Sequence, residues 1–196
     1  MRIFKILACA LLVPGIAGAQ APTEGNSSPE PNPRVQIVTS LGTFVVELDP
    51  QRAPFTVENF LNYVREGHYT GTIFHRVIHG FLAQGGGYTT DFSVKEPNQA
   101  VINESGNGLA NLRGTIGLAR TAAPHSGTSQ FYLNLSDNAD LNPRPTRWGY
   151  AVFGRIIEGM DVVDEIGQKP TGAGGGFARD VPAEMIVIER AGILSE

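Results

Sequence analysis

The amino-acid sequence predicts a mainly β fold, a closed eight-stranded antiparallel β-barrel capped by two α-helices. β-Branched and aromatic residues gather in about eight short runs, and loops containing glycine, asparagine and proline separate these runs. Only two stretches carry apolar residues at helical spacing, and they do not alternate with the strand-like runs as a parallel sheet requires. A closed barrel is the simplest arrangement, because closure removes exposed strand edges.

The first elements expected along the chain are a hairpin and a helix. Residues 35–40 and 43–48 are β-rich runs on either side of Leu41 and Gly42, which predicts a tight turn with glycine where a positive φ is easiest. The helix that follows is predicted by apolar residues at positions i, i+3, i+4 and i+7, namely Val57, Phe60, Leu61 and Val64. Thr56 is its expected N-cap, and Gly67 is expected to close it.

The second half of the chain supplies most of the remaining elements. Further strands are expected within residues 72–84, 115–120, 130–135, 149–157 and 184–190. A second helix is expected from Met160 to Ile166, with Val163 on the same side as both. The glycine run 172–176 lacks the preceding strand of a dinucleotide fingerprint and has Phe177 in place of its last glycine. We expect that run to be a flexible loop.

The N-terminal residues have the three-part layout of a secretory signal. Arg2 and Lys5 precede an apolar run, and small residues follow it up to Ala19, after which we expect cleavage. An alternative is a lipoprotein signal acylated at Cys9, which would place the cut near the start of the apolar run. The run is shorter than the roughly 20 residues of a membrane span. We therefore expect a periplasmic or secreted protein without a membrane span.

A linker separates this signal from the folded domain. Residues 20–33 contain four prolines and no large apolar side chain. Such a segment cannot offset its own ordering entropy, so a disordered linker is expected there. The folded domain is expected over residues 34–196.

Composition excludes several classes of function. The 196 residues include 15 Lys and Arg against 19 Asp and Glu, so no basic excess exists to hold a phosphate backbone. A nucleic acid is therefore not an expected partner. The single cysteine rules out an intramolecular disulfide, and it lies in the expected signal. Removing that signal also removes two bases and no acid, which leaves a mature chain with a net charge of −6.

The histidines and serines do not form a recognisable metal or hydrolytic motif. His75 and His79 are four residues apart, but they lie in a strand-like run, and His68 and His125 have no acidic residue at ligand spacing. Residues 127–131 resemble a nucleophile elbow but lack its closing glycine. We expect neither a metal nor any other cofactor.

Two segments instead place polar side chains among large apolar ones, FHRVIHGFLAQGGG at 74–87 and ARTAAPHSGTSQFYLNL at 119–135. Alternation along the first segment puts Arg76 on the same face as Phe74. Together with GYAVFGRIIEGMDVVDEI at 149–166, these blocks resemble the signature blocks of the cyclophilin-type peptidyl-prolyl cis-trans isomerases. The resemblance covers residues 34–194 and looks closer to the bacterial secreted branch than to the eukaryotic one.

The resemblance implies a cyclophilin-like barrel and an enzyme that catalyses cis-trans isomerisation of X-Pro bonds. Its substrates would be proline-containing polypeptides, and it would assist the folding of exported proteins. The resemblance gives Arg76 the role of donor to the prolyl nitrogen, and Gln84 that of holding the substrate carbonyl. The proline pocket would consist of Phe81, Leu82, Tyr132 and Leu141. Other residues that match family groove positions are Phe74, His75, Ala119, Arg120, Thr121, Gln130 and Tyr150.

Three of these positions, and a fourth at the groove rim, depart from the family pattern. Tyr132 replaces a phenylalanine, Leu82 a methionine and Tyr150 a histidine, while Asp140 stands where the family has a tryptophan at the groove rim. We expect weak cyclosporin binding for that last reason, since the only tryptophan is Trp148. A monomer is the default expectation. A peptide-binding holdase without catalysis and a metal or hydrolytic enzyme are the alternative functions.

Overall fold

The computed structural model describes residues 31–195. The expected signal and residues 20–30 of the expected linker lie outside this part of the chain. The first two strands, β1 (Arg34–Thr39) and β2 (Gly42–Leu48), pair as an antiparallel hairpin. Gly42 has a φ of 141°, and the Thr39 hydroxyl donates to its carbonyl at 2.8 Å. The expected hairpin and the position of its turn are therefore confirmed.

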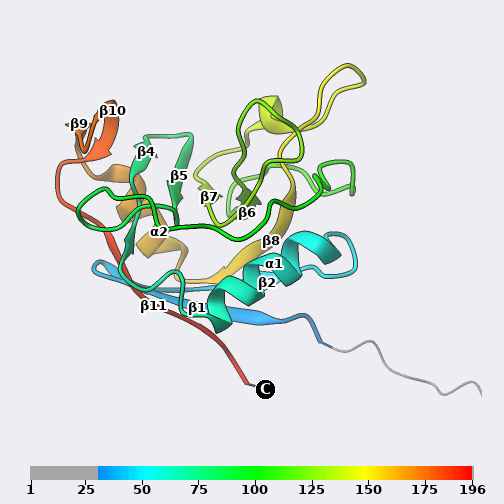
Figure 1. Ribbon diagram of the computed structural model, residues 1–196, viewed down its shortest axis with the longest axis horizontal. Helices are drawn as coiled ribbons and strands as arrows, with labels where there is room; N and C mark the ends of the chain where they lie inside the picture. The colour runs from blue at the N-terminus through cyan, green and yellow to red at the C-terminus, as the bar shows by residue number, and fades with distance from the viewer. Residues whose placement is uncertain (1–30, 196) are drawn as a thin grey trace, which may run out of the picture. The chain divides into compact units, whose positions relative to one another are not determined.

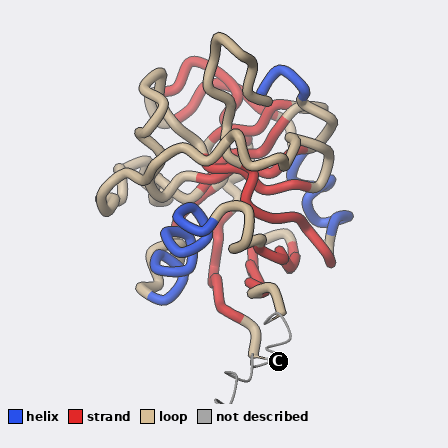
Figure 2. The backbone as a smooth tube through the Cα atoms, turned by 90° about the vertical axis from the view of Figure 1, so that its right-hand side faces the viewer, coloured by secondary structure: helices blue, strands red, loops and turns tan. Residues whose placement is uncertain are grey.

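The main sheet is antiparallel and curls into a half-barrel, as Figures 1 and 2 show. Its strand order is β3-β11-β1-β2-β8-β6-β7-β5-β4. The strands not yet located are β3 (Thr72–Ile73), β4 (Arg76–Ile78), β5 (Leu82–Gly85), β6 (Thr115–Leu118), β7 (Phe131–Asn134), β8 (Val152–Glu158) and β11 (Val187–Ile193). The mainly β class is confirmed.

The sheet differs from the expected closed eight-stranded barrel in strand number and in closure. Within residues 31–195 it has nine strands, and its two ends are β3 and β4. These strands follow each other along the chain, but they are only two and three residues long, and Phe74 and His75 separate them. One continuous run of β-forming residues, 72–84, therefore becomes three short strands, and the sheet stays open.

The helix α1 (Pro54–Arg65) confirms the first helical prediction but begins earlier than expected. Pro54 occupies the first turn, where its fixed φ and missing N–H are tolerated. Thr56 is therefore not the N-cap. Its N–H and hydroxyl both donate to Glu104, at 2.8 and 2.6 Å, so a carboxylate from a distant loop satisfies the helix N-terminus. Gly67, with a φ of 67°, follows the helix as expected.

The second helix, α2 (Met160–Gln168), buries Val163 and Ile166 completely, which confirms its predicted apolar side. It packs against β2, β4 and β5, whereas α1 packs against β11. Figures 1 and 2 place the two helices on opposite sides of the curled sheet. Helix α2 thus packs against the two strands that carry the 76–85 segment, β4 and β5.

A second, two-stranded sheet replaces the flexible loop that was expected at 172–176. Strand β9 (Thr171–Gly174) pairs with β10 (Phe177–Pro182), so that prediction is wrong. The turn is made by Gly175 and Gly176, with φ values of 54° and 86°. Positive φ at both turn residues matches the right-handed twist of a hairpin, and consecutive glycines allow it without strain. Strand β10 packs against β4.

Candidate active site

Strand pairing brings three predicted site residues into one row on the outer face of the sheet. Arg76 on β4 lies opposite Gln84 on β5, and Gln84 lies opposite Tyr132 on β7. Gly117 on β6 continues this row beside Tyr132. Directly paired residues of an antiparallel sheet share a face. The neighbouring pairs on the opposite face, such as Val77 with Ala83 and Leu133 with Ile116, belong to the hydrophobic core.

Glycine at position 117 is a steric requirement of this row. A Cβ there would lie 2.3 Å from the Tyr132 hydroxyl oxygen and from the ring carbon that bears it. The Tyr132 ring therefore lies flat across β6, with only 2% of its surface exposed. Leu82, two residues from Gln84 and on the same face, is 5% exposed. Phe81 and Leu141 are half-buried.

The hydroxyl that distinguishes Tyr132 from a phenylalanine has a buried partner. It donates to Asn111 Oδ1 at 2.5 Å, and Asn134 donates to the same oxygen at 3.2 Å. Asn138 bonds both Asn134 Oδ1, at 2.6 Å, and the Phe81 carbonyl, at 2.8 Å. Burial raises the pKa of Tyr132 well above its usual value, so the hydroxyl stays neutral. These asparagines therefore link the Tyr132 hydroxyl to the Phe81 backbone through a continuous set of hydrogen bonds.

A second group of predicted residues lies on the adjoining loops. The Arg120 guanidinium stacks on the Tyr150 ring at 4.3 Å, and Arg120 Nε donates to the Gly149 carbonyl at 3.0 Å. Tyr150 meets Tyr132 edge to face, with 6.1 Å between ring centroids. Arg120 therefore holds Tyr150 against Tyr132. The Arg120 guanidinium already interacts with other groups of the protein.

The remaining loop residues border the same row. Gln84 Nε2 donates to Gln130 Oε1 at 2.9 Å, and the Gln130 carbonyl accepts the Ala119 N–H, also at 2.9 Å. Thr121 is exposed, and its hydroxyl and the Ser126 hydroxyl are hydrogen-bonded at 2.8 Å. Gly87 is close by, because a Cβ there would lie 2.4 Å from the Gln130 side chain. The structure thus brings together residues from three separate segments of the chain.

Two of the predicted residues, Phe74 and His75, do not reach the outer surface. Phe74 is 1% exposed and packs edge to face on Phe131 in the core. His75 is 3% exposed and lies under the rings of Tyr88 and Phe177, at centroid distances of 4.5 and 5.6 Å. Phe74 therefore belongs to the core, whereas His75 belongs to an aromatic group beside the β9–β10 hairpin.

The buried His75 is electrically neutral near pH 7. Burial, and secondarily the charge of Arg76, lowers its pKa from 6.5 to about 4. Its Nδ1 atom has no hydrogen-bond partner among the described residues. Arg76 is therefore the permanent positive charge of its strand. Its side chain is 38% exposed and forms an ion pair with Asp180.

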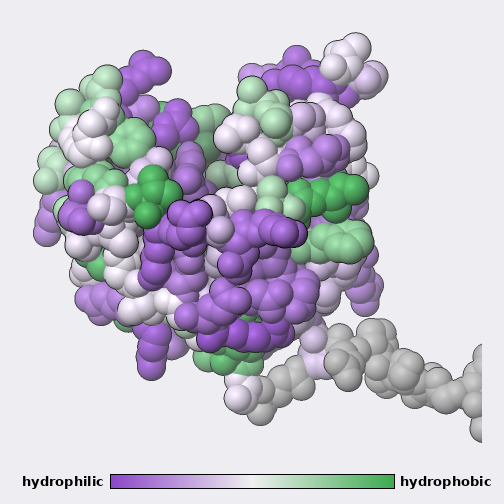
Figure 3. Space-filling model, viewed as in Figure 1, coloured by the Kyte–Doolittle hydropathy of each residue, from purple (hydrophilic) through white to green (hydrophobic). Residues whose placement is uncertain are grey.

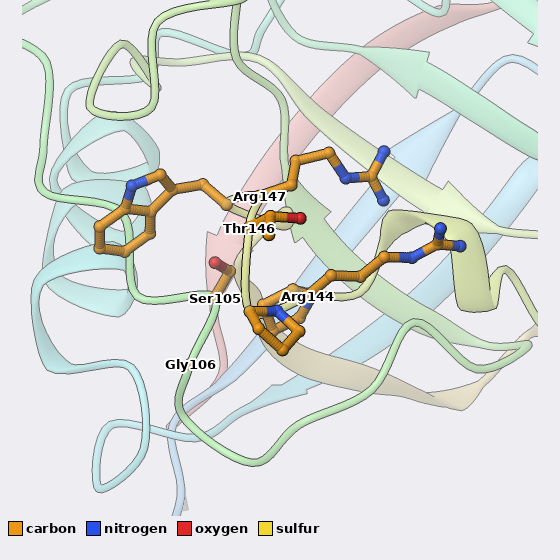
Figure 4. A pocket seen from close by; sticks show the side chains of 8 residues that line it. Ser105, Gly106, Arg144, Thr146 and Arg147 are labelled. Carbon is orange, nitrogen blue, oxygen red and sulfur yellow. The ribbon is translucent and has the colours of Figure 1, made fainter.

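A cavity of about 440 Å³ lies next to this site, lined by Ser105, Gly106 and residues 143–148 (Figure 4). Arg144 and Arg147 extend to the same side of the loop, where both bond Asp140. The loop connects to the site through Arg120, which donates to the Trp148 carbonyl at 2.8 Å. In Figure 3 the surface is hollowed between the part formed by β4 and the β9–β10 hairpin and the part that carries this loop.

The part of the chain that the structure describes contains no group of three or more His, Cys, Asp or Glu side chains placed to hold a metal ion. His75 is buried and His79 is exposed, so the two do not face a common site. Neither helix of residues 31–195 has the length and apolarity that a membrane crossing requires.

The sequence profile of the family described as "Cyclophilin type peptidyl-prolyl cis-trans isomerase/CLD" matches residues 34–193. The chain belongs to this family. Among the relatives of this cyclophilin, peptidyl-prolyl cis-trans isomerase cyp18 of Streptomyces antibioticus is 53% identical over 163 residues, which cover 82% of this chain and 98% of the relative. Peptidyl-prolyl cis-trans isomerase B of Escherichia coli is 48% identical, over 77% of this chain and 93% of the relative.

A solved structure agrees with the fold. The cyclophilin-type peptidyl-prolyl cis-trans isomerase of Cryptosporidium parvum superposes with a TM-score of 0.70 at 26% identity, covering 84% of this chain and 99% of that one. Family membership classes the protein as a peptidyl-prolyl cis-trans isomerase, or rotamase, of class EC 5.2.1.8.

Two contributors to the site were missed by sequence reasoning. Asn111 partners the Tyr132 hydroxyl, and Asp180 partners Arg76. The need of a buried tyrosine hydroxyl for a partner was a usable signal, but many asparagines could have met it. No sequence signal pointed to Asp180, because the segment preceding it was expected to be a loop.

Proposed function

We propose that this cyclophilin accelerates rotation about X-Pro bonds in exported polypeptides, and that Arg76 donates a hydrogen bond to the prolyl nitrogen in the transition state. The observation that carries the proposal is the row formed by Arg76, Gln84 and Tyr132 across three paired strands. Arg76, a permanently charged hydrogen-bond donor, lies at one end of this row, and the aromatic ring of Tyr132 lies at the other. The reaction needs no cofactor and breaks no covalent bond.

The chemistry calls for such an arrangement. Rotation of a planar amide faces a barrier of about 18–20 kcal/mol, and spontaneous exchange takes tens to hundreds of seconds. The twisted transition state has a pyramidal, more basic nitrogen than either planar state. A donor aimed at that nitrogen stabilises the transition state selectively, and each tenfold gain in rate requires about 1.4 kcal/mol. Arginine suits this role because it stays protonated and directional.

The neighbouring side chains would divide the remaining tasks. Phe81, Leu82, Tyr132 and Leu141 would enclose the proline ring in apolar surface and exclude water from the amide, which strengthens the hydrogen bond from Arg76. Gln84 would hold the substrate carbonyl. Its Nε2 donates one hydrogen to Gln130, which fixes the amide plane and leaves the second hydrogen for the substrate.

The folding of exported proteins is the setting that the N-terminal sequence supports. The signal ending at Ala19 and a periplasmic or secreted location remain proposals, and both rest on residues outside 31–195. A groove of this kind meets mainly a proline and its neighbour, so we expect broad selectivity among unfolded polypeptides and a monomeric enzyme.

Weak cyclosporin binding follows from the groove rim. The Asp140 side chain, 88% exposed and paired with Arg144, stands where the family resemblance places a tryptophan. A carboxylate there offers cyclosporin no apolar ring to pack against. Inhibition of the wild type in the nanomolar range would contradict this expectation, whereas Asp140→Trp should increase the sensitivity.

A protease-coupled assay with a proline-containing tetrapeptide tests the catalytic role. Arg76→Ala should lose about a hundredfold or more in kcat/KM, the usual cost of removing one donor to a developing charge. Arg155→Ala is the matched control, because it removes an exposed arginine of the same sheet that pairs with Glu47. Thermal unfolding should show that both variants fold. Full activity in a folded Arg76→Ala protein would refute the mechanism, and peptide binding without catalysis in the wild type would favour a holdase.

A further inference from the structure

The ion pair between Arg76 and Asp180 joins the main sheet to the β9–β10 hairpin. Asp180 Oδ2 lies 3.6 Å from Arg76 Nε, and the two side chains are 38% and 22% exposed. A guanidinium has donors on two edges. The Asp180 carboxylate attracts the guanidinium from the Nε edge. The N–H groups at the other edge, on the Nη atoms, stay available to another acceptor.

The backbone at Asp180 is held in an unfavourable conformation. Its φ is 67°, and Phe92 is the only other non-glycine residue of the described chain with a positive φ. L-residues avoid this region, although aspartate tolerates it better than most. The pairing of β10 with β9 shifts register between Phe177 and Val181, so Asp180 lies in an irregular stretch of the strand. Such conformations persist where surrounding contacts impose them, often at functional sites.

Contacts on both sides of this irregular stretch fix it in place. Phe177 packs on His75 and meets Tyr88 edge to face, at centroid distances of 5.6 and 5.2 Å. Val181 is 5% exposed. The adjacent residues His75 and Arg76 therefore both meet β10, one through an aromatic contact and the other through a charge. Arg179 Nε also approaches Asp180 Oδ2, at 3.7 Å, but its side chain is 85% exposed.

We propose that Asp180 is a positioning residue for Arg76 and holds the guanidinium over the row that includes Gln84. This inference rests on the proposed function. A long, half-exposed arginine has many rotamers, and a rigidly placed carboxylate reduces their number. The proline pocket contains neither residue, so losing the carboxylate should lower kcat and leave KM nearly unchanged. Misplacing a catalytic group in this way can cost up to about a hundredfold in rate.

Two substitutions at this position separate charge from backbone effects. Asp180→Asn keeps the shape and an acceptor oxygen but removes the charge, whereas Asp180→Gly removes the side chain and accepts the positive φ without strain. We expect kcat to fall about threefold in the first and about tenfold in the second, with KM changing by less than about twofold. Asp164→Asn is the matched control, because it breaks the Arg113–Asp164 pair at α2 and should retain wild-type kcat.

A nuclear magnetic resonance measurement reads the contact directly. The Nε–H signal of Arg76, assigned by its loss in Arg76→Ala, should shift in both Asp180 variants and stay in place in Asp164→Asn. Thermal unfolding identifies any variant that does not fold. Asp180→Gly is expected to fold, because glycine adopts the positive φ of this position without strain.

The outcomes distinguish the positioning role from the proposed function. An inactive Arg76→Ala together with wild-type kcat in Asp180→Gly would overturn the positioning role and leave the function intact. An unshifted Nε–H signal in Asp180→Gly would also overturn it. Full activity in Arg76→Ala would overturn the proposed mechanism, and the positioning role with it.

Discussion

Replacing His75 by phenylalanine should remove a specific part of the pH dependence of stability. The pKa of His75 falls from 6.5 in the unfolded chain to about 4 in the folded protein, mainly because the ring is buried. Between these values the unfolded state binds a proton that the folded state does not, so stability falls as the pH is lowered. At about 1.4 kcal/mol per pH unit, the loss between pH 7 and pH 4 amounts to about 3 kcal/mol.

Phenylalanine is the replacement of choice, because His75 packs against the rings of Tyr88 and Phe177 and its Nδ1 makes no hydrogen bond there. The contribution of His75 is fully present above about pH 6.5 and is lost as the pH falls toward 4. The variant should therefore become more stable than the wild type at pH 4 by about 3 kcal/mol relative to their difference at pH 7.

Urea unfolding at half-unit intervals from pH 4 to pH 7 measures this quantity as a difference between the two proteins. Other groups that titrate in this range, including His68 with its lowered pKa, cancel in the difference. Tyr88→Phe is the control, since it alters a neighbouring ring and keeps the titrating imidazole. If the difference in unfolding free energy between wild type and variant stays constant from pH 4 to pH 7, His75 is not held neutral by burial.

Two further predictions concern the packing of the Tyr132 ring and the N-terminus of α1. Gly117→Ala should destabilise the protein by about 2–4 kcal/mol and displace the Tyr132 ring, because the new Cβ meets that ring at 2.3 Å. Gly106→Ala is its control, with no atom within 4 Å, and equal melting temperatures for the two variants would refute the steric argument. Glu104→Gln should cost about 1 kcal/mol by weakening the bonds to the N-terminus of α1, seen as a fall of about 2–4 °C in melting temperature. An unchanged melting temperature would count against that role.

The elements best predicted from sequence were those with strong local patterns. The hairpin at Gly42 follows from two β-rich runs flanking a glycine turn, and the apolar sides of both helices follow from a periodicity of 3.6 residues. Both signals are properties of neighbouring positions. The start of α1 was misplaced because Glu104, far away along the chain, performs the capping that Thr56 was expected to perform. The β9–β10 hairpin was missed because a run of glycines carries no periodic pattern, although two of them make its turn.

For the candidate site, too, local motifs predicted one part correctly and another part wrongly. The motifs around Arg76 and Gln130 identified segments that lie side by side in the structure, and the resemblance assigned roles to single residues within them. Alternation along the strand put Phe74 on the face of Arg76, but a break between β3 and β4 turns Phe74 into the core. A short break in a strand resets the alternation, and sequence periodicity does not reveal where such a break occurs.

The sequence by itself determined the family, the class of fold and the segments that carry the candidate site, because these depend on residue types in local order. The tertiary structure decided that Arg76, Gln84 and Tyr132 form one row, that Asn111 receives the tyrosine hydroxyl, and that Asp180 meets the arginine. Apart from the pairing of Arg76 with Gln84 in consecutive strands, these contacts join separate segments of the chain. They depend on which strands pair and in what register, and register is set by the packing of the whole sheet.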